Sequence, residues 1–273
     1  MVTASIVIYK TPEELIKKIL YCSHTSIIEK IYVIDNSPTD SMRRMILDSS
    51  DKVIYIYGHG NIGYGAAHNV GIKEAMKIGA DYHVVLNPDI RFAEGTIEAL
   101  EAFAKNHIDI GMIMPNVIYP NGRQQYLCKL SPSPLDILGR RLLPDYLFAK
   151  RNARYEMRET GYDRIRNVPC LSGCFMFLNL QIIERVGLFD ERFFMYFEDF
   201  DLIRRIHKVS KTIFFPKVTI IHDHAGEHRT NKKLLKISIE STIKYFNKWG
   251  WIFDLDRKLW NKYAFDSNNI ISE

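Results

Sequence analysis

Three carboxylates lie within a single short run, FEDFD. They are Glu198, Asp199 and Asp201, and five aromatic residues flank them: Phe193, Phe194, Tyr196, Phe197 and Phe200. One interpretation is purely structural: acidic residues in the first turn of a helix and arginines nearer its end interact favourably with the helix dipole. Crowded carboxylates in an apolar pocket, however, have raised pKa values, which suit a general base. The run therefore predicts a proton-transfer site.

Polar side chains also follow two predicted strands at the point where each strand ends. Asp35 closes the strand 30–35, and the sequence Asn87-Pro88-Asp89 closes the strand 82–87. Such residues are common turn formers, but two such ends on strands expected to be neighbours favour a ligand site. Asp89 suits a hard divalent cation, Mn²⁺ or Mg²⁺, that also takes phosphate oxygens. Asp35 is suited to accept a hydrogen bond from a nucleobase N–H or a ribose hydroxyl.

A glycine-rich segment, GHGNIGYGAAHNVG, lies between these two strand ends. As a dinucleotide fingerprint it is incomplete, because His68 occupies the third glycine position and the segment follows the third strand instead of the first. Glycines such as Gly63 still allow a ligand to approach the backbone at a helix N-terminus. Asn61 and Asn69 would add side-chain donors for that ligand.

Histidines gather in IIHDHAGEH, residues 220–228, as His222, His224 and His228. Their spacing makes a metal contact plausible, but a zinc hydrolase built from them would need an activated water that nothing else in the sequence supports. Cys170 and Cys174 are also four residues apart. Two further ligands at matching spacing are missing, so buried free thiols are the commoner case.

The first half of the chain alternates strand and helix patterns. Strands are expected at 5–9, 30–35, 53–57, 82–87 and 110–115, with helices between them, one of which covers 65–79. This alternation predicts an α/β fold with a doubly wound, mostly parallel sheet. A hairpin with its turn at Asn121-Gly122 should follow. Residues 131–166 lack clean periodicity and are expected to be mobile or to cover a substrate, and 212–221 is expected to form a strand pair.

The bulk composition is that of a soluble protein with two basic segments. Its 273 residues are 47% hydrophobic and carry a net charge of +5. Residues 140–166 hold eight basic and four acidic side chains, and residues 229–262 hold nine basic and three acidic ones. Such segments attract phosphates, anionic lipids or nucleic acid. No apolar stretch is long enough to cross a bilayer and no signal peptide is apparent, so a cytoplasmic location is expected.

The tail carries all three tryptophans, Trp249, Trp251 and Trp260, among many lysines. It is expected either to pack on the catalytic domain or to attach the protein peripherally to an anionic membrane surface on the inner face of the cell membrane. A basic nucleic-acid-binding protein is an alternative function, although no recognised nucleic-acid-binding module accompanies the basic residues.

Six motifs in order resemble glycosyltransferase family 2 in its rhamnosyltransferase-like branch: SIVIYK, VIDNSPTD, NIGYGAAHNVGI, LNPDI, LSGCFMF and GLFDERFFMYFEDFDLIRR. The resemblance implies the GT-A fold over 1–228, with a nucleotide-sugar-binding half (1–115) and an acceptor-binding half (116–228), followed by a helical tail (229–273). It implies an inverting, metal-dependent sugar transfer from dTDP-rhamnose or a UDP-hexose to a hydroxyl of a growing, lipid-linked cell-surface polysaccharide. A sugar-nucleotide-binding protein without catalysis is a further alternative.

The resemblance also implies roles for single residues on the donor side. Tyr9, Lys10 and Asp35 would line the nucleobase pocket, and Asn87 would approach the ribose. Asp89 would hold Mn²⁺ or Mg²⁺ against the diphosphate.

On the acceptor side, the resemblance implies that Asp199 deprotonates the acceptor hydroxyl. His222, or alternatively His224, would be a further metal ligand. Glu198 would bind or orient the acceptor. The residues expected where the acceptor-side loop meets the donor sugar are Gly173 and Cys174.

Overall fold

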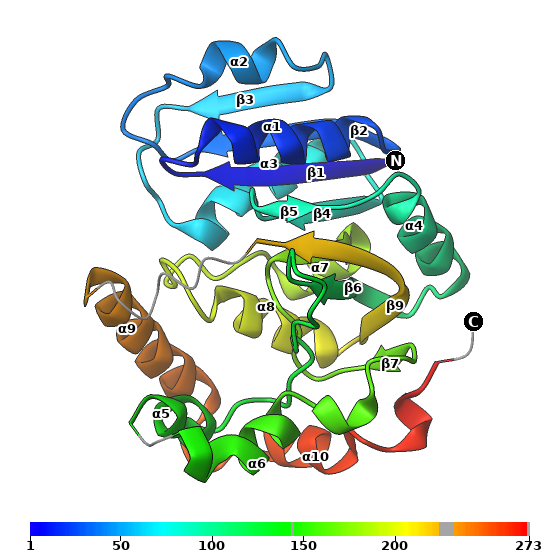
Figure 1. The fold of residues 1–273 in the computed structure, drawn as a ribbon, viewed down its shortest axis with the longest axis vertical. Helices are drawn as coiled ribbons and strands as arrows, with labels where there is room; N and C mark the ends of the chain where they lie inside the picture. Colours follow the sequence, from blue (N-terminus) through cyan, green and yellow to red (C-terminus); the bar gives the residue numbers. More distant parts are fainter. Residues whose placement is uncertain (143–144, 224–231, 272–273) are drawn as a thin grey trace.

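The computed structural model of the protein describes residues 1–142, 145–223 and 232–271 (Figure 1). Its centre is one mixed sheet with the strand order β3-β2-β1-β4-β8-β6-β9-β5, and β7 pairs with β9. The first-half strands are β1 (Val2–Ile8), β2 (Ile28–Asp35), β3 (Val53–Tyr57) and β4 (Tyr82–Leu86). These four strands run parallel to one another, as their alternation with helices predicts. The expectation that strands 30–35 and 82–87 are neighbours is wrong, because β1 lies between β2 and β4 and pairs with both.

Helices cover both faces of this parallel half. The helices are α1 (Glu13–His24), α2 (Arg43–Leu47), α3 (Tyr64–Lys77) and α4 (Thr96–Asn106). Figure 1 shows α1 in front of the sheet and α3 behind it. All seven residues of β1 are buried, because a central strand between two helix layers has no solvent face. Gly71 lets α3 approach the sheet, since a Cβ there would lie 2.7 Å from the Cβ of Ser5.

The second half of the sheet adds antiparallel pairing. β8 (Phe175–Asn179) runs antiparallel between β4 and β6 (Ile110–Ile118), and β6 runs parallel to β9 (Lys211–His222). The expected strand pair over 212–221 is thus wrong, because β9 is one strand. Its register against β6 shifts between Phe215 and Thr219, around Pro216. Proline lacks an N–H for the ladder, so it produces a bulge that interrupts the pairing without ending the strand.

Two short strands were not predicted from the sequence. They are β5 (Ile90–Arg91) and β7 (Arg166–Asn167), and both pair antiparallel with β9. Ile90 pairs with His222, so β5 brings the loop that holds Asp89 against the end of β9. The predicted turn at Asn121-Gly122 is confirmed, since Gly122 donates a backbone hydrogen bond to Tyr119.

The segment 131–166 is mostly helical, although its sequence lacks clean periodicity; that it moves or covers a substrate stays a prediction. It contains α5 (Pro134–Leu142), α6 (Asp145–Tyr155) and a 3₁₀ turn (Arg158–Thr160). The side chain of Asn261, in α10 (Leu255–Tyr263), accepts from Ser131 N–H and donates to Ser131 C=O, both at 2.8 Å. These contacts come from the far end of the chain, so no local periodicity could have indicated them.

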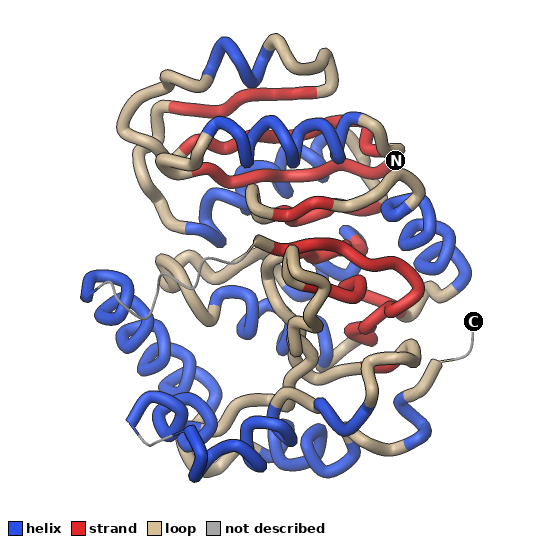
Figure 2. The backbone as a smooth tube through the Cα atoms, in the orientation of Figure 1, coloured by secondary structure: helices blue, strands red, loops and turns tan. Residues whose placement is uncertain are grey.

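The C-terminal helices pack against the FEDFD region. That region forms α8 (Glu198–His207), preceded by the short helix α7 (Leu180–Val186), and the tail forms α9 (Lys232–Trp249), α10 and a 3₁₀ turn (Ser267–Asn269). A second apolar cluster joins Phe193 and Phe197 to Tyr245 and Phe246 of α9. The tube in Figure 2 shows α9 and α10 below the sheet, on the side of α8 away from the parallel strands. Within the described ranges, no helix has the length and apolar character of a membrane-spanning segment.

A buried ion pair fixes the tail to α8. Arg204 donates to both carboxylate oxygens of Asp254, and its guanidinium lies 4.3 Å from the ring centre of Trp249 and 5.5 Å from that of Trp260. Asp201 is fully buried and accepts from Trp249 Nε1 at 2.8 Å. Two of the three tail tryptophans therefore contact charged residues of α8. Asp201, the third carboxylate of FEDFD, serves this packing.

Candidate active site

The ends of the central strands bring the sequence-predicted residues to one edge of the sheet. Ile8 is paired with Asp35, and the N–H of Asn36 donates to the carbonyl of Ile8 at 2.9 Å. At the end of β4, the N–H of Asn87 donates to the carbonyl of Cys174 at 3.0 Å. The segments that follow β1, β2 and β4 and the segment that precedes β8 therefore meet at this edge.

Tyr9, Lys10 and Asp35 lie together at the ends of β1 and β2. Tyr9 is 46% exposed, and the N–H of Lys10 donates to Ser37 Oγ at 2.9 Å. Asp35 is buried, and its two oxygens accept from Ser37 N–H at 2.8 Å and from Tyr55 O–H at 2.6 Å. Burial, and then the bond to Asp35, raise the pKa of Tyr55. Each carboxylate oxygen keeps a second lone pair for a further donor.

The glycine-rich entry to α3 packs on the loop before α8. Gly63 has a φ of +94°, and a Cβ there would lie 2.3 Å from the carbonyl oxygen of Phe194. The neighbouring Tyr64 N–H donates to that same oxygen at 2.9 Å. The close backbone approach at Gly63 is thus to the protein itself. Asn61 is exposed, and its Oδ1 accepts from Gly63 N–H at 3.2 Å.

Asn69 has partners that differ from the expected nucleotide. Its side chain is 1% exposed, with Oδ1 accepting from Phe189 N–H and Nδ2 donating to Phe189 C=O, both at 2.9 Å. The amide thus pairs with a backbone segment 120 residues away in sequence. Asn69 braces the loop that leads to α8, and its position offers no support for a direct contact with a ligand.

Tyr64 is a site residue that the sequence interpretation missed. Its hydroxyl lies 2.9 Å from Asn87 Oδ1 and 2.8 Å from the carbonyl oxygen of Gly173. Burial, followed by the charge of Glu198, raises the pKa of Tyr64 well above its ordinary value, so the phenol stays a donor. Tyr64 lies between glycines in the glycine-rich segment, and no local sequence pattern indicates that its hydroxyl reaches the site.

Asp199 is held by two backbone donors at the start of α8. Its Oδ2 accepts from Gly173 N–H and its Oδ1 accepts from Phe200 N–H, both at 2.9 Å. A Cβ on Gly173 would lie 2.8 Å from the Cβ of Asp199, so glycine permits this approach. Burial raises the pKa of Asp199, and the two N–H donors and then the charge of Lys129 oppose the rise.

Glu198 is the more deeply buried member of the pair. It is 5% exposed, and within the described ranges its Oε2 has no hydrogen-bond partner. Burial, and then the charge of Asp199, raise the pKa of Glu198 well above its ordinary value. The expectation of raised pKa values thus holds for Glu198 and Asp199. Because Asp199 has the donors and a nearby cation, it ionises first, and Glu198 keeps its proton to higher pH.

The turn that presents this pair has an unusual backbone. Tyr196 and Phe197 have φ values of +69° and +67°, in the left-handed region that non-glycine residues rarely occupy. Such strain persists only where surrounding contacts enforce it. Here the ring of Phe197 packs 5.1 Å from the ring of Tyr245. The tail helix α9 therefore supports the conformation in which Glu198 and Asp199 enter the site.

Lys129 is the second residue that the sequence interpretation missed. Its Nζ lies 5.5 Å from the ring centre of Phe200, and its charge lowers the pKa of Asp199. It follows the predicted hairpin as an isolated lysine, so only the fold reveals its proximity to the carboxylates. Cys170, whose backbone pairs with that of Lys129, and Cys174 are buried free thiols. Burial raises the pKa of Cys174 to about 12.

Asp89 and His222 form a pair at the join of β5 and β9. Nε2 of His222 lies 3.5 Å from Oδ1 of Asp89. That oxygen is buried and has no hydrogen-bond partner among the residues described. His224 and His228, the other candidates of the histidine run, lie outside the described residues. Within those that are described, no group of three or more His, Cys, Asp or Glu side chains forms a metal centre.

Gln125 determines which nitrogen of His222 carries the proton. Its Nε2 donates to the carbonyl oxygen of His222 at 2.7 Å, and a carbonyl can only accept. The amide oxygen of Gln125 is then the atom 3.0 Å from Nδ1, so Nδ1 donates. In the neutral ring, Nε2 therefore has its lone pair toward Asp89. Two acceptor atoms facing each other call for a proton or a cation between them, so this pair fits a divalent metal.

Comparisons with known proteins agree with this geometry. Residues 6–187 match the profile of Glycosyl transferase family 2. The N-acetylglucosaminyl-diphospho-decaprenol L-rhamnosyltransferase of Mycobacterium tuberculosis is 28% identical over 243 residues, which cover 83% of this chain and 75% of that protein. The fold, the carboxylates that follow the strands and the carboxyl pair at the start of α8 thus occur in a chain whose sequence matches sugar-transferring enzymes. The chain belongs to glycosyl transferase family 2.

Solved structures show the same fold. GalNAc-T7, solved with UDP, GalNAc and Mn²⁺, superposes with a TM-score of 0.65 at 12% identity, covering 91% of this chain and 48% of that one. The mannosyltransferase PcManGT from Pyrobaculum calidifontis, in complex with GDP-Man and Mn²⁺, gives 0.61 at 14% identity, covering 90% and 64%. The chain thus spans less than two thirds of either solved protein. This chain is a glycosyltransferase with the GT-A fold.

Proposed function

We propose that this glycosyltransferase moves a sugar from a nucleoside diphosphate sugar to a hydroxyl of a lipid-diphosphate-linked acceptor, with inversion at the anomeric carbon. Rhamnose carried by dTDP is the first donor to test, ahead of a UDP-hexose, because the similar mycobacterial protein is named an L-rhamnosyltransferase. The name of that protein also supports a lipid-linked acceptor. Such an acceptor would place the enzyme peripherally on the cytoplasmic face of the membrane.

The observation that carries this proposal is the environment of Asp199. A carboxylate with a raised pKa, fixed by two N–H donors and next to a second carboxyl group, is suited to take a proton from an attacking hydroxyl. The activated hydroxyl would attack the anomeric carbon on the side opposite the leaving diphosphate, so the configuration inverts. Glu198, whose pKa burial and the charge of Asp199 raise well above its ordinary value, would in its protonated form donate a hydrogen bond that orients the acceptor.

Donor binding is assigned to the edge formed by β1, β2 and β4. Tyr9, Lys10 and Asp35 would hold the nucleobase, and Asn87 would approach the ribose. Tyr64 would keep Asn87 in place through its hydroxyl. Gly173 and Cys174 lie between this edge and Asp199, which supports their placement beside the transferred sugar.

Asp89 and His222 would hold the divalent cation. When bound, the cation would neutralise charge on the departing diphosphate. One carboxylate and one imidazole nitrogen favour Mn²⁺ over Mg²⁺, since Mg²⁺ strongly prefers oxygen ligands.

The test is a transfer assay with purified protein, Mn²⁺, a panel of nucleoside diphosphate sugars and a GlcNAc-diphospho-lipid acceptor. We expect product from one donor, with inverted configuration by NMR. Asp199→Asn preserves the shape of the side chain and should lower kcat by about 10²-fold or more. Near-normal turnover by a folded Asp199→Asn protein would remove the assigned base. Product of retained configuration would refute single displacement.

A further inference from the structure

Helix α9 carries partly exposed aliphatic side chains along the border of its buried face. Leu235, Ile239 and Ile243 recur every fourth residue and are 42%, 43% and 44% exposed. With 3.6 residues per turn, this spacing puts all three along one side of the helix. The adjoining side of the helix is buried and includes hydroxyl groups, among them Ser241, whose Oγ donates to the carbonyl of Met195 at 2.8 Å. A surface helix usually buries its apolar side chains and exposes its polar ones. In α9, three aliphatic side chains are partly exposed while hydroxyl groups are buried.

The turn between α9 and α10 projects a second apolar group. Ile252, Phe253 and Leu255 are 80%, 92% and 84% exposed. The turn is held from beneath by the guanidinium of Arg257, which donates to three successive carbonyl oxygens, those of Gly250, Trp251 and Ile252. An ordered turn that presents three apolar side chains to the outside marks a contact surface.

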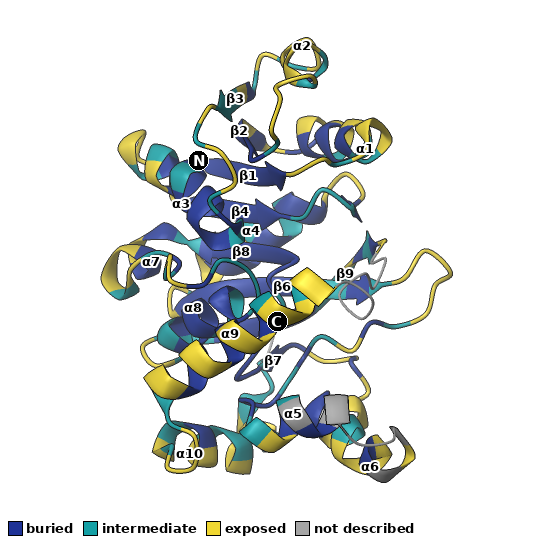
Figure 3. Ribbon diagram, turned by 90° about the vertical axis from the view of Figure 1, so that its left-hand side faces the viewer, coloured by how far each residue is buried: buried dark blue, intermediate teal, exposed yellow. Residues whose placement is uncertain are grey.

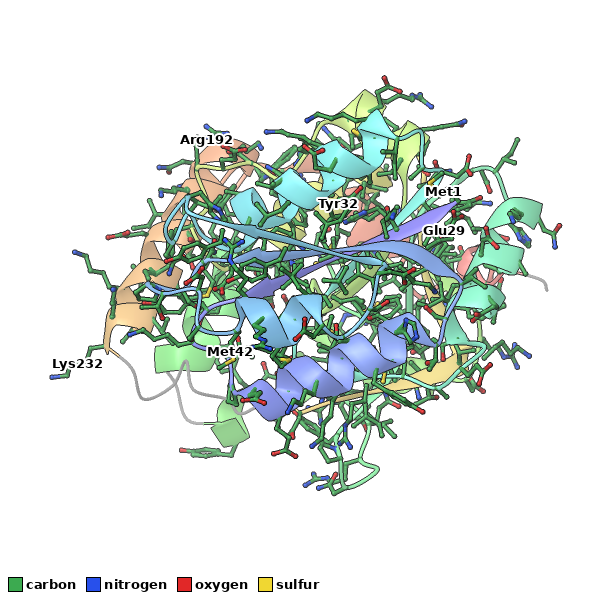
Figure 4. The ribbon with its side chains drawn as sticks, turned by 90° about the horizontal axis from the view of Figure 1, so that it is seen from above. Met1, Glu29, Tyr32, Met42, Arg192 and Lys232 are labelled. Carbon is green, nitrogen blue, oxygen red and sulfur yellow. The ribbon has the colours of Figure 1, made fainter. Side chains whose placement is uncertain are left out.

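Lysines border the aliphatic stripe. Lys232, Lys236 and Lys244 are exposed, although Nζ of Lys244 donates to the carbonyl oxygen of Arg192 at 2.7 Å. Figure 4 shows the labelled Lys232 pointing away from the body of the protein. Residues 232–263 contain eight basic and three acidic side chains. An apolar stripe flanked by lysines is the pattern of a helix that lies in the headgroup region of an anionic bilayer. A second copy of the chain would oppose lysine to lysine, so self-association is the less favoured use of this surface.

The stripe faces the same side of the molecule as the candidate active site. In Figure 1 the arrow of β1 points left, and Figure 3 looks onto that left-hand side. In Figure 3, α9 crosses the lower half of the molecule with exposed residues toward the viewer. A bilayer contacting α9 would therefore lie on the side where the strand ends and Asp199 are located.

We propose that α9 and the turn 251–255 form a docking surface for an anionic lipid bilayer. The aliphatic stripe and the turn enter the headgroup region, and the lysines contact acidic lipid headgroups. The lipid contact rests on exposure and charge alone. Only its use in presenting a lipid-linked acceptor rests on the proposed function.

The experiment is sedimentation of the full chain with vesicles. The vesicles are phosphatidylcholine alone, or phosphatidylcholine and phosphatidylglycerol at about 3:1. We expect binding to the anionic vesicles that weakens with salt. The triple substitution Ile252→Ser, Phe253→Ser and Leu255→Ser should lower the partition coefficient about tenfold or more. The matched control is Ile108→Ser, since Ile108 is 86% exposed but lies between α4 and β6, and it should bind like the wild type.

Equal vesicle binding by the triple variant and the wild type would overturn the proposal. A second result would also overturn it: the wild type does not bind vesicles but forms a dimer in sedimentation velocity, and the triple substitution converts that dimer to a monomer. Transfer to a short-chain, water-soluble acceptor should be unchanged in the triple variant. That assay separates failure of the lipid contact from failure of the proposed function, because only the latter abolishes transfer in solution.

Discussion

The N–H of Gly173 donates a 2.9 Å hydrogen bond to Oδ2 of Asp199, across 26 residues of sequence. The carbonyl of the same glycine lies 2.8 Å from the hydroxyl of Tyr64, whose other neighbour is Asn87. One peptide segment thus connects the end of β4 and the start of α3 to the carboxylate at the start of α8. The positions of the donor-side and acceptor-side residues are coupled through Gly173.

Gly173→Ala should therefore reduce turnover without unfolding the protein. The added Cβ would lie 2.8 Å from the Cβ of Asp199, so the carboxylate must move. We expect kcat to fall at least about tenfold, since small misplacements of reacting groups are costly. Steady-state kinetics and thermal unfolding measure the two effects. Gly79→Ala is the control: it is strained by a φ of +72° but has open space around it, so it should lose stability and keep kcat.

Lys129→Met should shift the pH dependence of the reaction. The positive charge of Lys129 lowers the pKa of Asp199, so its removal raises that pKa. The acid limb of kcat/KM should then move to higher pH by about one unit, because a nearby cation favours the ionised carboxylate. Lys150→Met, on the exposed side of α6, should leave the profile in place. An unchanged acid limb in Lys129→Met would show that Asp199 is not the titrating base.

Gln125→Met should weaken Mn²⁺ binding by about 10–100-fold, the usual effect of losing the residue that orients a metal-binding histidine. Methionine has a similar volume but cannot accept from Nδ1 of His222. Isothermal titration of the protein with Mn²⁺, without any sugar donor, gives the affinity directly. Gln124→Met is the matched control, since the Gln124 amide bonds only to backbone carbonyls in the described contacts. Equal affinity in the two variants would remove the orienting role of Gln125.

Acid should destabilise the protein through a buried histidine in the sheet. Burial lowers the pKa of His83 to about 3, and its ring bonds to the hydroxyls of Thr3 and Ser5, both at 2.8 Å. Between about pH 6.5 and about pH 3 the unfolded chain takes up a proton at this position and the folded chain does not. The contribution of His83 to the free energy of unfolding therefore falls as pH falls, by about 1.4 kcal/mol per unit. The buried His68 and the partly buried His207, whose pKa values are also lowered by burial, act in the same sense.

Urea denaturation at about pH 7 and about pH 5 measures this dependence. His83→Asn should show a shallower loss of stability between the two pH values, because asparagine does not titrate. Replacement of the exposed His24 by asparagine serves as the control. Glu198 and Asp199 act in the opposite sense, since their pKa values are raised, so the comparison is between variants at each pH. Equal slopes for His83→Asn and the wild type would contradict the prediction.

Periodicity and residue type by themselves predicted the fold class and the family of this protein. The alternation of short buried strands with amphipathic helices predicted the parallel half of the sheet, because those patterns depend on neighbours close in sequence. The carboxylates at the end of β2 and after β4 predicted a ligand site at this edge of the sheet. The motifs in their order pointed to the family, and the crowding of Glu198 and Asp199 predicted their raised pKa values.

Only the tertiary structure decided which of the chemically suitable residues meet. Tyr64, Lys129 and Gln125 acquire their importance from contacts with residues between 23 and 109 positions away, or from the fold that brings Lys129 to Asp199. Asn69, which was predicted to contact the nucleotide, bonds to the backbone of Phe189 in the folded protein. The helices within 131–166 form against a tail more than 100 residues later. Hydrogen bonds and burial between distant segments leave no periodic trace in a sequence, so they appear only when the chain is folded.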